Sequence, residues 1–133
     1  MTQEQKDILI KDLCSRLPYG VKAEKYTIRI DGEFIPYRHV EVVTAKDIIT
    51  KKDCPGYMIR PYLFPLSSMT KEQEKEYRKA CQLDMEILSK HPLDGTPFPA
   101  MFNSQDWLDA HHFDYRGLIP MNLAIDSTNK NIY

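Results

Sequence analysis

The sequence has few of the residues on which common phosphate-binding and metal-binding motifs depend. Only five of its 133 residues are glycine, and neither a P-loop nor a GxGxxG pattern occurs. Such glycines let the backbone approach a phosphate closely, so a nucleotide cofactor held by a glycine-rich loop is not expected. The three cysteines are widely spaced and form no CxxC pair. This spacing argues against a structural zinc site and favours reduced thiols, and we expect no cofactor.

The chain also lacks an excess of charge of either sign and any long apolar run. Eighteen Lys and Arg residues balance nineteen Asp and Glu residues, which leaves a net charge of -1. This balance gives no general attraction for phosphate backbones, so nucleic-acid binding is not expected unless a local basic patch supports it. No apolar run approaches the roughly 18 residues of a membrane helix. The N-terminus lacks the basic-then-apolar order of a signal peptide, and we expect a cytoplasmic protein without a membrane partner.

What is present is typical of one globular domain. Hydrophobic residues make up 42% of the sequence and charged residues 28%, as in ordinary globular proteins. We therefore expect a single domain over residues 1–133.

A helix is expected at the N-terminus. Thr2 and Gln5 match a capping box, in which each side chain bonds a free backbone N–H of the first turn. Pro18 and Gly20 end the helix. An apolar stripe at helical spacing gives it a face to bury, formed by Leu9, Leu13 and Leu17.

Residues 21–64 have the alternation of short strands. The apolar positions change parity near Glu24 and Lys25, which predicts a β-bulge there. Asp31-Gly32 predicts a hairpin turn. Further strands are expected at Asp47–Thr50 and Tyr57–Phe64, separated by a turn at 54–56.

Two more helices are expected in the second half. The first spans Ser67–Lys90, with Thr70 and Gln73 as a second capping box. Its charge-rich first half is interpreted as a solvated face, with a partner-binding surface as the alternative. Asn103 or Ser104 caps the second helix, which cannot run far beyond residue 112.

Together these elements predict an α+β fold. Its centre is a small, curved antiparallel sheet, of the SH3-like or Sm-like half-barrel kind, with an N-terminal helix and C-terminal helices.

Candidate site residues concentrate in the run from Asp106 to Asp126. Two adjacent histidines, His111 and His112, would diverge by about 100° on a helix and could not easily share one metal ion. A third ligand would have to come from a distant residue such as His39 or His91. We therefore expect no metal site, and interpret one histidine as packing on a neighbouring aromatic ring.

Three residues beside the histidines could bind a ligand or lock the fold. Arg116, next to Tyr115, could clamp a phosphate or carboxylate, but we favour the interpretation that Asp114 holds the arginine in an ion pair. A His–Asp pair could also act in acid–base catalysis. The sequence supplies no obvious nucleophile, since no GxSxG motif occurs.

The apolar residues of the same run are interpreted as structural anchors. The only tryptophan, Trp107, and Phe113 are expected to hold this run to the body of the domain, and deletion of the Trp107 side chain to cost roughly 3–5 kcal/mol.

Three blocks resemble those of an uncharacterised family of small proteins found in Bacteroidales genomes, often in prophage-like or mobile-element surroundings. The blocks are LCSRLPYGV (13–21), IRPYLFPLSSMT (59–70) and DWLDAHHFDYRGLIPMNLAID (106–126), about a third of the chain. The resemblance implies a phage or mobile-element accessory role in the cytoplasm. It implies no activity and no catalytic residue.

Two hypotheses about function follow. The first is a non-enzymatic binding or interaction module that engages a host protein, a small ligand or nucleic acid, and that could interfere with a host system. The second is a small hydrolase or nuclease that uses His111, His112, Asp114 and Arg116. Because no catalytic constellation is complete, we favour the first.

Overall fold

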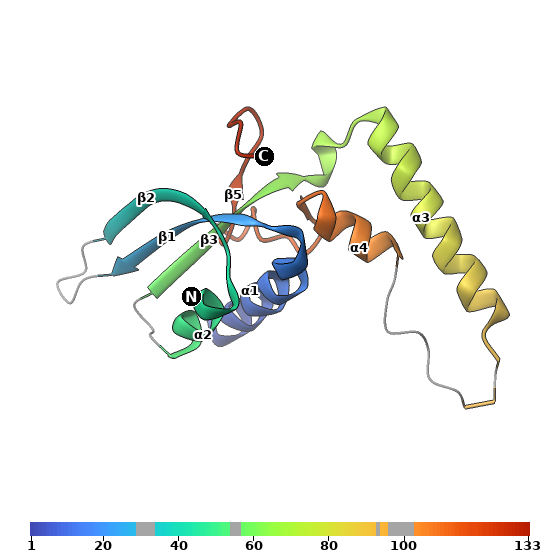
Figure 1. Ribbon diagram of the computed structural model, residues 1–133, viewed down its shortest axis with the longest axis horizontal. Coiled ribbons are helices and arrows are strands. Elements are labelled where there is room, and N and C mark those ends of the chain that lie inside the picture. Colours follow the sequence, from blue (N-terminus) through green and yellow to red (C-terminus); the bar gives the residue numbers. More distant parts are fainter. Residues whose placement is uncertain (29–33, 54–56, 93, 96–102) are drawn as a thin grey trace.

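The computed structural model describes residues 1–28, 34–53, 57–92, 94–95 and 103–133. Its fold class is α+β, as predicted (Figure 1). In chain order the elements are α1 (Gln3–Arg16), the 3-10 turn η1 (Leu17–Tyr19), β1 (Lys22–Ile28), β2 (Phe34–Val42), α2 (Ala45–Asp53), β3 (Tyr57–Pro65), the 3-10 turn η2 (Leu66–Ser68), α3 (Lys71–Lys90), α4 (Asn103–Ala110), β4 (Phe113–Asp114) and β5 (Ile125–Asp126).

The N-terminal helix α1 begins and ends as its sequence predicts. The Gln5 backbone N–H donates to the Thr2 hydroxyl at 3.1 Å, and the Thr2 N–H donates to the Gln5 side-chain oxygen at 3.0 Å. This reciprocal pair is a capping box. The helix passes into η1, after which Gly20 adopts φ 67°, a left-handed conformation that favours glycine.

The sheet is open and mixed. Strand β1 pairs antiparallel with β2 and with β3, and the predicted bulge lies between Glu24 and Lys25. The Asp31-Gly32 turn that would join β1 to β2 lies outside the described residues. Short strands β4 and β5 both pair parallel with β3. The expected purely antiparallel sheet is therefore wrong at this point, because the C-terminal run returns along β3 in the same direction. The described strands form no closed barrel.

The strand expected at Asp47–Thr50 is wrong, since these residues belong to helix α2. The Thr44 N–H donates to the Asp47 carboxylate at 2.8 Å, and the Asp47 N–H donates to the Thr44 hydroxyl at 3.3 Å. This local cap starts a helix despite the β-branched residues that follow. Helical spacing then buries Ile48 and leaves Ile49 61% exposed. The turn expected at 54–56 lies outside the described residues.

The hydrophobic core lies between α1, α2, the sheet and the C-terminal run. It consists of Leu9, Leu13, Val21, Ala23, Val43, Ile48, Ile59, Leu63, Leu118, Leu123 and Ala124. Figure 1 shows α1 and α2 together on one side of the strands.

Helix α3 stands at the edge of the molecule, alongside α4 and away from the β1–β2 part of the sheet (Figure 1). Its capping box is confirmed, because the Gln73 N–H donates to the Thr70 hydroxyl at 3.1 Å. The helix starts at Lys71 rather than Ser67, since residues 66–68 form the separate turn η2. Helix α4 ends at Ala110, within the limit predicted.

Candidate functional site

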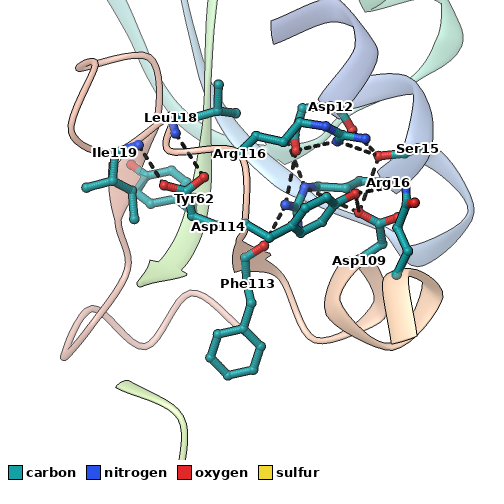
Figure 2. A network of polar contacts seen from close by, with 12 residues as sticks. Asp12, Ser15, Arg16, Tyr62, Asp109, Phe113, Asp114, Arg116, Leu118 and Ile119 are labelled. Atoms are coloured by element: carbon teal, nitrogen blue, oxygen red, sulfur yellow. Dashed lines mark hydrogen bonds and ion pairs between the residues drawn. The ribbon is translucent and has the colours of Figure 1, made fainter. Parts of the chain in front are cut away.

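Two arginines, Arg16 and Arg116, bind the carboxylate of one aspartate of α1, Asp12. Asp12 and Arg16 are one turn apart and fully buried, and the Arg16 Nε donates to Asp12 at 2.8 Å. The Arg116 Nη1, from the C-terminal run, donates to the same carboxylate at 2.8 Å and to the Ser15 hydroxyl at 3.1 Å. The Arg16 Nη2 also reaches the Phe113 carbonyl at 2.6 Å. Figure 2 shows these groups facing one another, with the Phe113 ring directed away from them.

A second carboxylate, Asp109, completes the cluster from α4. It is 2% exposed and accepts hydrogen bonds from the Tyr115 hydroxyl at 2.8 Å and from Ser15 at 3.3 Å. The Arg16 Nε lies 3.9 Å away. Burial raises the pKa of Asp109 above its usual value, although the Tyr115 hydrogen bond and the positive charge of Arg16 oppose this shift.

The six residues Asp12, Ser15, Arg16, Asp109, Tyr115 and Arg116 are called here the ionic cluster. Two carboxylates balance two guanidinium groups, and both guanidinium groups lie over the Tyr115 ring, at 5.3 Å and 4.6 Å from its centroid. Most hydrogen-bond donors and acceptors of the ionic cluster bond to one another. The Arg16 Nη1 is the exception, being buried without a hydrogen-bond partner among the described residues. An arrangement of this kind joins α1, α4 and the C-terminal run to one another.

The ion pair predicted between Asp114 and Arg116 is wrong, because Arg116 pairs with Asp12 instead. The two carboxylate oxygens of Asp114 accept the backbone N–H groups of Leu118 and Ile119, each at 2.9 Å. Gly117, between Asp114 and Leu118, has φ 74°, which favours glycine. Figure 2 shows Asp114 directed toward this turn and away from the ionic cluster. Its role in the geometry is to hold the chain reversal that places Leu118 in the core.

His112, just before β4, packs against Tyr133. Its backbone has φ 62°, and its ring stacks on Tyr133 with centroids 3.8 Å apart. Its Nδ1 is buried without a hydrogen-bond partner among the described residues. Burial, together with the positive charge of Arg16, lowers the pKa of His112 to about 4, so the ring is neutral near pH 7.

His111 stacks on Trp107, as one of the two histidines was expected to do. The ring centroids lie 4.0 Å apart, and the His111 Nδ1 lies 2.8 Å from the Trp107 carbonyl. A carbonyl only accepts, so in the neutral ring the proton resides on Nδ1 and the lone pair on Nε2. Phe113 stacks on Trp107 at 5.7 Å, and the indole N–H donates to Glu76 of α3 at 3.3 Å. Trp107 thus joins α4 to both α3 and the C-terminal run.

Asp84 fixes α3 to the start of α4. Its carboxylate accepts the backbone N–H of Asn103 at 2.6 Å and that of Ser104 at 2.9 Å, and also the Ser104 hydroxyl. Burial raises the pKa of Asp84, but these hydrogen bonds outweigh it and the pKa is lowered overall. The cap expected from Asn103 or Ser104 is thus supplied from another helix.

A shallow, open groove of about 510 Å³ lies between helices α3 and α4 and is called here the α3–α4 groove. Its wall on α3 includes Ala80 and Leu83, and its floor on α4 includes Trp107, Ala110 and His111. The remaining lining residues are Tyr19, Glu76, Lys79, Asn103 and Asp106. A second cavity, of about 410 Å³, is lined by Leu66, Ser67, Met69, Glu74, Tyr77, Leu108 and Tyr115.

The predicted site residues are therefore dispersed. No hydrogen bond among the described residues joins any two of His111, His112, Asp114 and Arg116. His111 lines the α3–α4 groove and Tyr115 the second cavity, while the other three line neither. The described part of the chain contains no group of three His, Cys, Asp or Glu side chains placed to hold a metal ion.

Sequence reasoning missed Asp12, Arg16 and Asp84. The sequence does carry a signal for the first two. Asp12 and Arg16 form a charged i,i+4 pair on the same helix as the apolar residues Leu9 and Leu13, and charged groups are buried in a core only when they are paired. No local signal marks Asp84, whose partners lie 19 and 20 residues away.

Comparison of the chain with protein-family models, with curated proteins and with solved structures found no match. Among the described helices, none combines the length and the apolar character needed to cross a membrane.

Proposed function

We propose that the chain is a non-enzymatic binding module whose binding site is the α3–α4 groove. Its partner would be a protein segment with an apolar side and a flanking Lys or Arg. The single observation that carries this proposal is an open, largely apolar groove between two helices at the edge of the molecule. Exposed apolar side chains continue it along α3, where Leu83 is 51% exposed and Ile87, one turn further on, is 41% exposed.

The charges around the groove favour a basic partner. The carboxylates of Glu76 and Asp106 line it, against a single ammonium group, that of Lys79. At the same edge, burial and the negative charges of Asp106 and Asp109 raise the pKa of Tyr19. The local potential therefore attracts cationic side chains, which would steer a basic segment toward the groove and fix its orientation.

The biological setting is proposed from the resemblance of the three sequence blocks alone. On that basis the chain is a cytoplasmic phage or mobile-element accessory protein that interferes with a host system. The strands β1 to β3 would act as an SH3-like half-barrel scaffold that carries α3 and α4.

Leu83 and Met85 provide a matched pair for testing the groove. Both are exposed apolar residues of α3, at 51% and 68%, but only Leu83 lines the groove. A photo-crosslinking residue at position 83 or at position 85 would be introduced into the full chain and irradiated in host-cell lysate. We expect a protein adduct from position 83 and little from position 85. Leu83→Asp should abolish capture by an affinity-tagged chain, whereas Met85→Asp should not.

Competition then tests the chemistry of the partner. A synthetic amphipathic helix of Leu and Lys should displace the adduct-forming partner, and the same helix with Glu in place of Lys should not. Trp107, the only tryptophan, lines the groove and reports occupancy through its fluorescence. Equal crosslinking at both positions, equal competition by both helices, or no adduct at all would contradict the proposal.

A further inference from the structure

One face of α3 carries a stripe of apolar and charged side chains that is centred on Leu83. Its members follow one another at intervals of one, three or four residues, so they share one side of the helix. Leu83 is 51% exposed, and Ile87, one turn further on, is 41% exposed. Four exposed charged residues of both signs complete the stripe: Glu76, Lys79, Glu86 and Lys90.

The charges of this stripe complement one another when two copies of α3 pair antiparallel. In a symmetric pair with its two-fold axis at Leu83, residues equally far before and after Leu83 face each other. Glu76, seven residues before it, meets Lys90 of the second copy, seven residues after it. Lys79 meets Glu86 of the second copy on one flank in the same way. A parallel pair would instead place each charge beside its own counterpart, and like charges repel.

The α3–α4 groove runs along only the first half of α3. Helix α4 packs beside that half, where Trp107 contacts Tyr77 and Glu76, and its start is held by Asp84. The last turns of α3, with Ile87, continue beyond this point (Figure 1).

An antiparallel pair therefore lays the second half of each α3 along the groove of the other copy. Ile87 of the second copy then faces Ala80, which is buried and lines the groove. Lys90 of the second copy lies toward the carboxylates of Glu76 and Asp106, which also line it.

We propose that a second copy of this chain occupies the α3–α4 groove, so that two chains form a symmetric dimer through antiparallel α3 helices. The inference rests on the proposed function, because α3 of the second copy is itself an apolar segment with a flanking lysine. Ile87 and Lys90 of each copy complete the groove of the other. The dimer covers both grooves, so a different partner binds only by displacing the second copy.

Sedimentation velocity of the purified full chain over a concentration series tests the dimer. We expect a reversible shift from the 15.6 kDa monomer toward a species of twice that mass. One helix from each chain makes a small contact, so we expect a Kd of about 10–100 µM and a monomer in dilute solution. Leu83→Asp should abolish the dimer, because it places two carboxylates at the two-fold axis. Met85→Asp, at an exposed position on the opposite side of α3, should leave the Kd unchanged.

Charge reversal tests the antiparallel register. Lys90→Glu and Glu76→Lys should each raise the Kd by roughly tenfold or more, since each sets like charges against each other at both ends of the symmetric dimer. An equimolar mixture of the two variants should associate nearly as well as the wild type, because opposite charges then meet at both ends. Lys71→Glu, at an exposed position of α3 outside the proposed contact, is the control and should change nothing.

Two results would overturn the inference. One is a wild-type chain that stays monomeric at about 1 mM, well above the expected Kd. The other is a mixture that associates no better than its two components do alone. Neither bears on the proposed function, which is tested by capture of a different protein from lysate through position 83. Conversely, a dimer with the expected charge rescue but no captured protein would contradict the proposed function alone.

Discussion

Arg16 and Asp12 join the first helix to the last part of the chain. Both side chains are fully buried, and the pair is extended by Arg116 and by the Phe113 carbonyl. A buried ion pair of this kind adds little net stability compared with apolar residues of similar volume, but removal of one partner leaves a charge unbalanced. Its contribution here is to fix how α1 and the C-terminal run meet.

Asp12→Asn tests this view of the ionic cluster. The change leaves two arginines around a neutral side chain, and we expect the free energy of unfolding to fall by about 3–5 kcal/mol. Urea denaturation at pH 7 measures the loss. The double variant Asp12→Leu/Arg16→Met should lose less than the single variant does. A single variant as stable as the wild type would show that the ionic cluster does not fix how α1 and the C-terminal run meet.

At the scale of elements, α3 depends on a few contacts with α4. Asp84 holds the first turn of α4, and Tyr77 and Glu76 contact Trp107. Much of the remaining apolar surface of α3 is exposed, with Leu83, Met85, Ile87 and Leu88 each more than a third exposed. The contacts that hold α3 are thus mainly those with α4, and its exposed apolar face is suited to binding a partner.

Asp84→Ala should loosen this attachment. Loss of a cap costs about 1–2 kcal/mol, and we expect faster hydrogen exchange in α3 and α4, with little change in β1 and β3. Glu86→Ala, at an exposed position of the same helix, is the control and should change neither. Uniformly faster exchange across the sheet would indicate that α3 and the core unfold as one unit.

Trp107→Ala should destabilise α4 and its contacts with both neighbours. The ring stacks on His111 and Phe113 but is only half-buried. We therefore expect a loss of about 3 kcal/mol, the lower end of the sequence-based range. Thermal melting followed by circular dichroism measures it, with Trp107→Phe as the milder change. An unchanged melting temperature would indicate that the anchor of the C-terminal run lies elsewhere.

At the scale of the whole molecule, His112 and Tyr133 link stability to pH. The pKa of His112 is lowered to about 4 in the folded protein, while the unfolded value is near 6.5. Between these values the unfolded chain binds a proton that the folded chain does not, so stability falls as pH decreases from 6.5 to 4. The full loss is on the order of 2–3 kcal/mol after allowance for solvent screening. Buried Asp109, whose pKa is raised, acts in the opposite direction.

His112→Asn isolates this contribution, because asparagine tolerates the positive φ of position 112. Urea denaturation at several pH values should give a flatter profile between pH 6.5 and 4 for the variant than for the wild type. At the alkaline end, burial raises the pKa of Tyr133 to about 12, so stability should fall as pH rises above 10. Tyr133→Phe should make that second fall smaller without removing it, because burial also raises the pKa of other tyrosines such as Tyr115. Parallel profiles for wild type and variants would contradict these assignments.

Local patterns predicted much of the secondary structure. The two capping boxes, the bulge at Glu24 and Lys25, and the short helix with Trp107 depend on residues close together in the sequence. The β-branched residues of Asp47–Thr50 favour a strand, but the cap formed by Thr44 and Asp47 starts a helix there. The signal for the helix is therefore also local.

Local sequence patterns are sufficient to predict the α+β class, the helix starts and the concentration of polar and aromatic groups in the C-terminal run, because backbone capping and side-chain periodicity are local properties. Which polar groups meet depends on long-range packing. Arg116 pairs with Asp12, 104 residues away, rather than with its neighbour Asp114, which instead holds the turn before Leu118. The groove between α3 and α4 also exists only through long-range packing. Burial makes an unpaired charge costly, so partners are selected by the fold and not by distance along the chain.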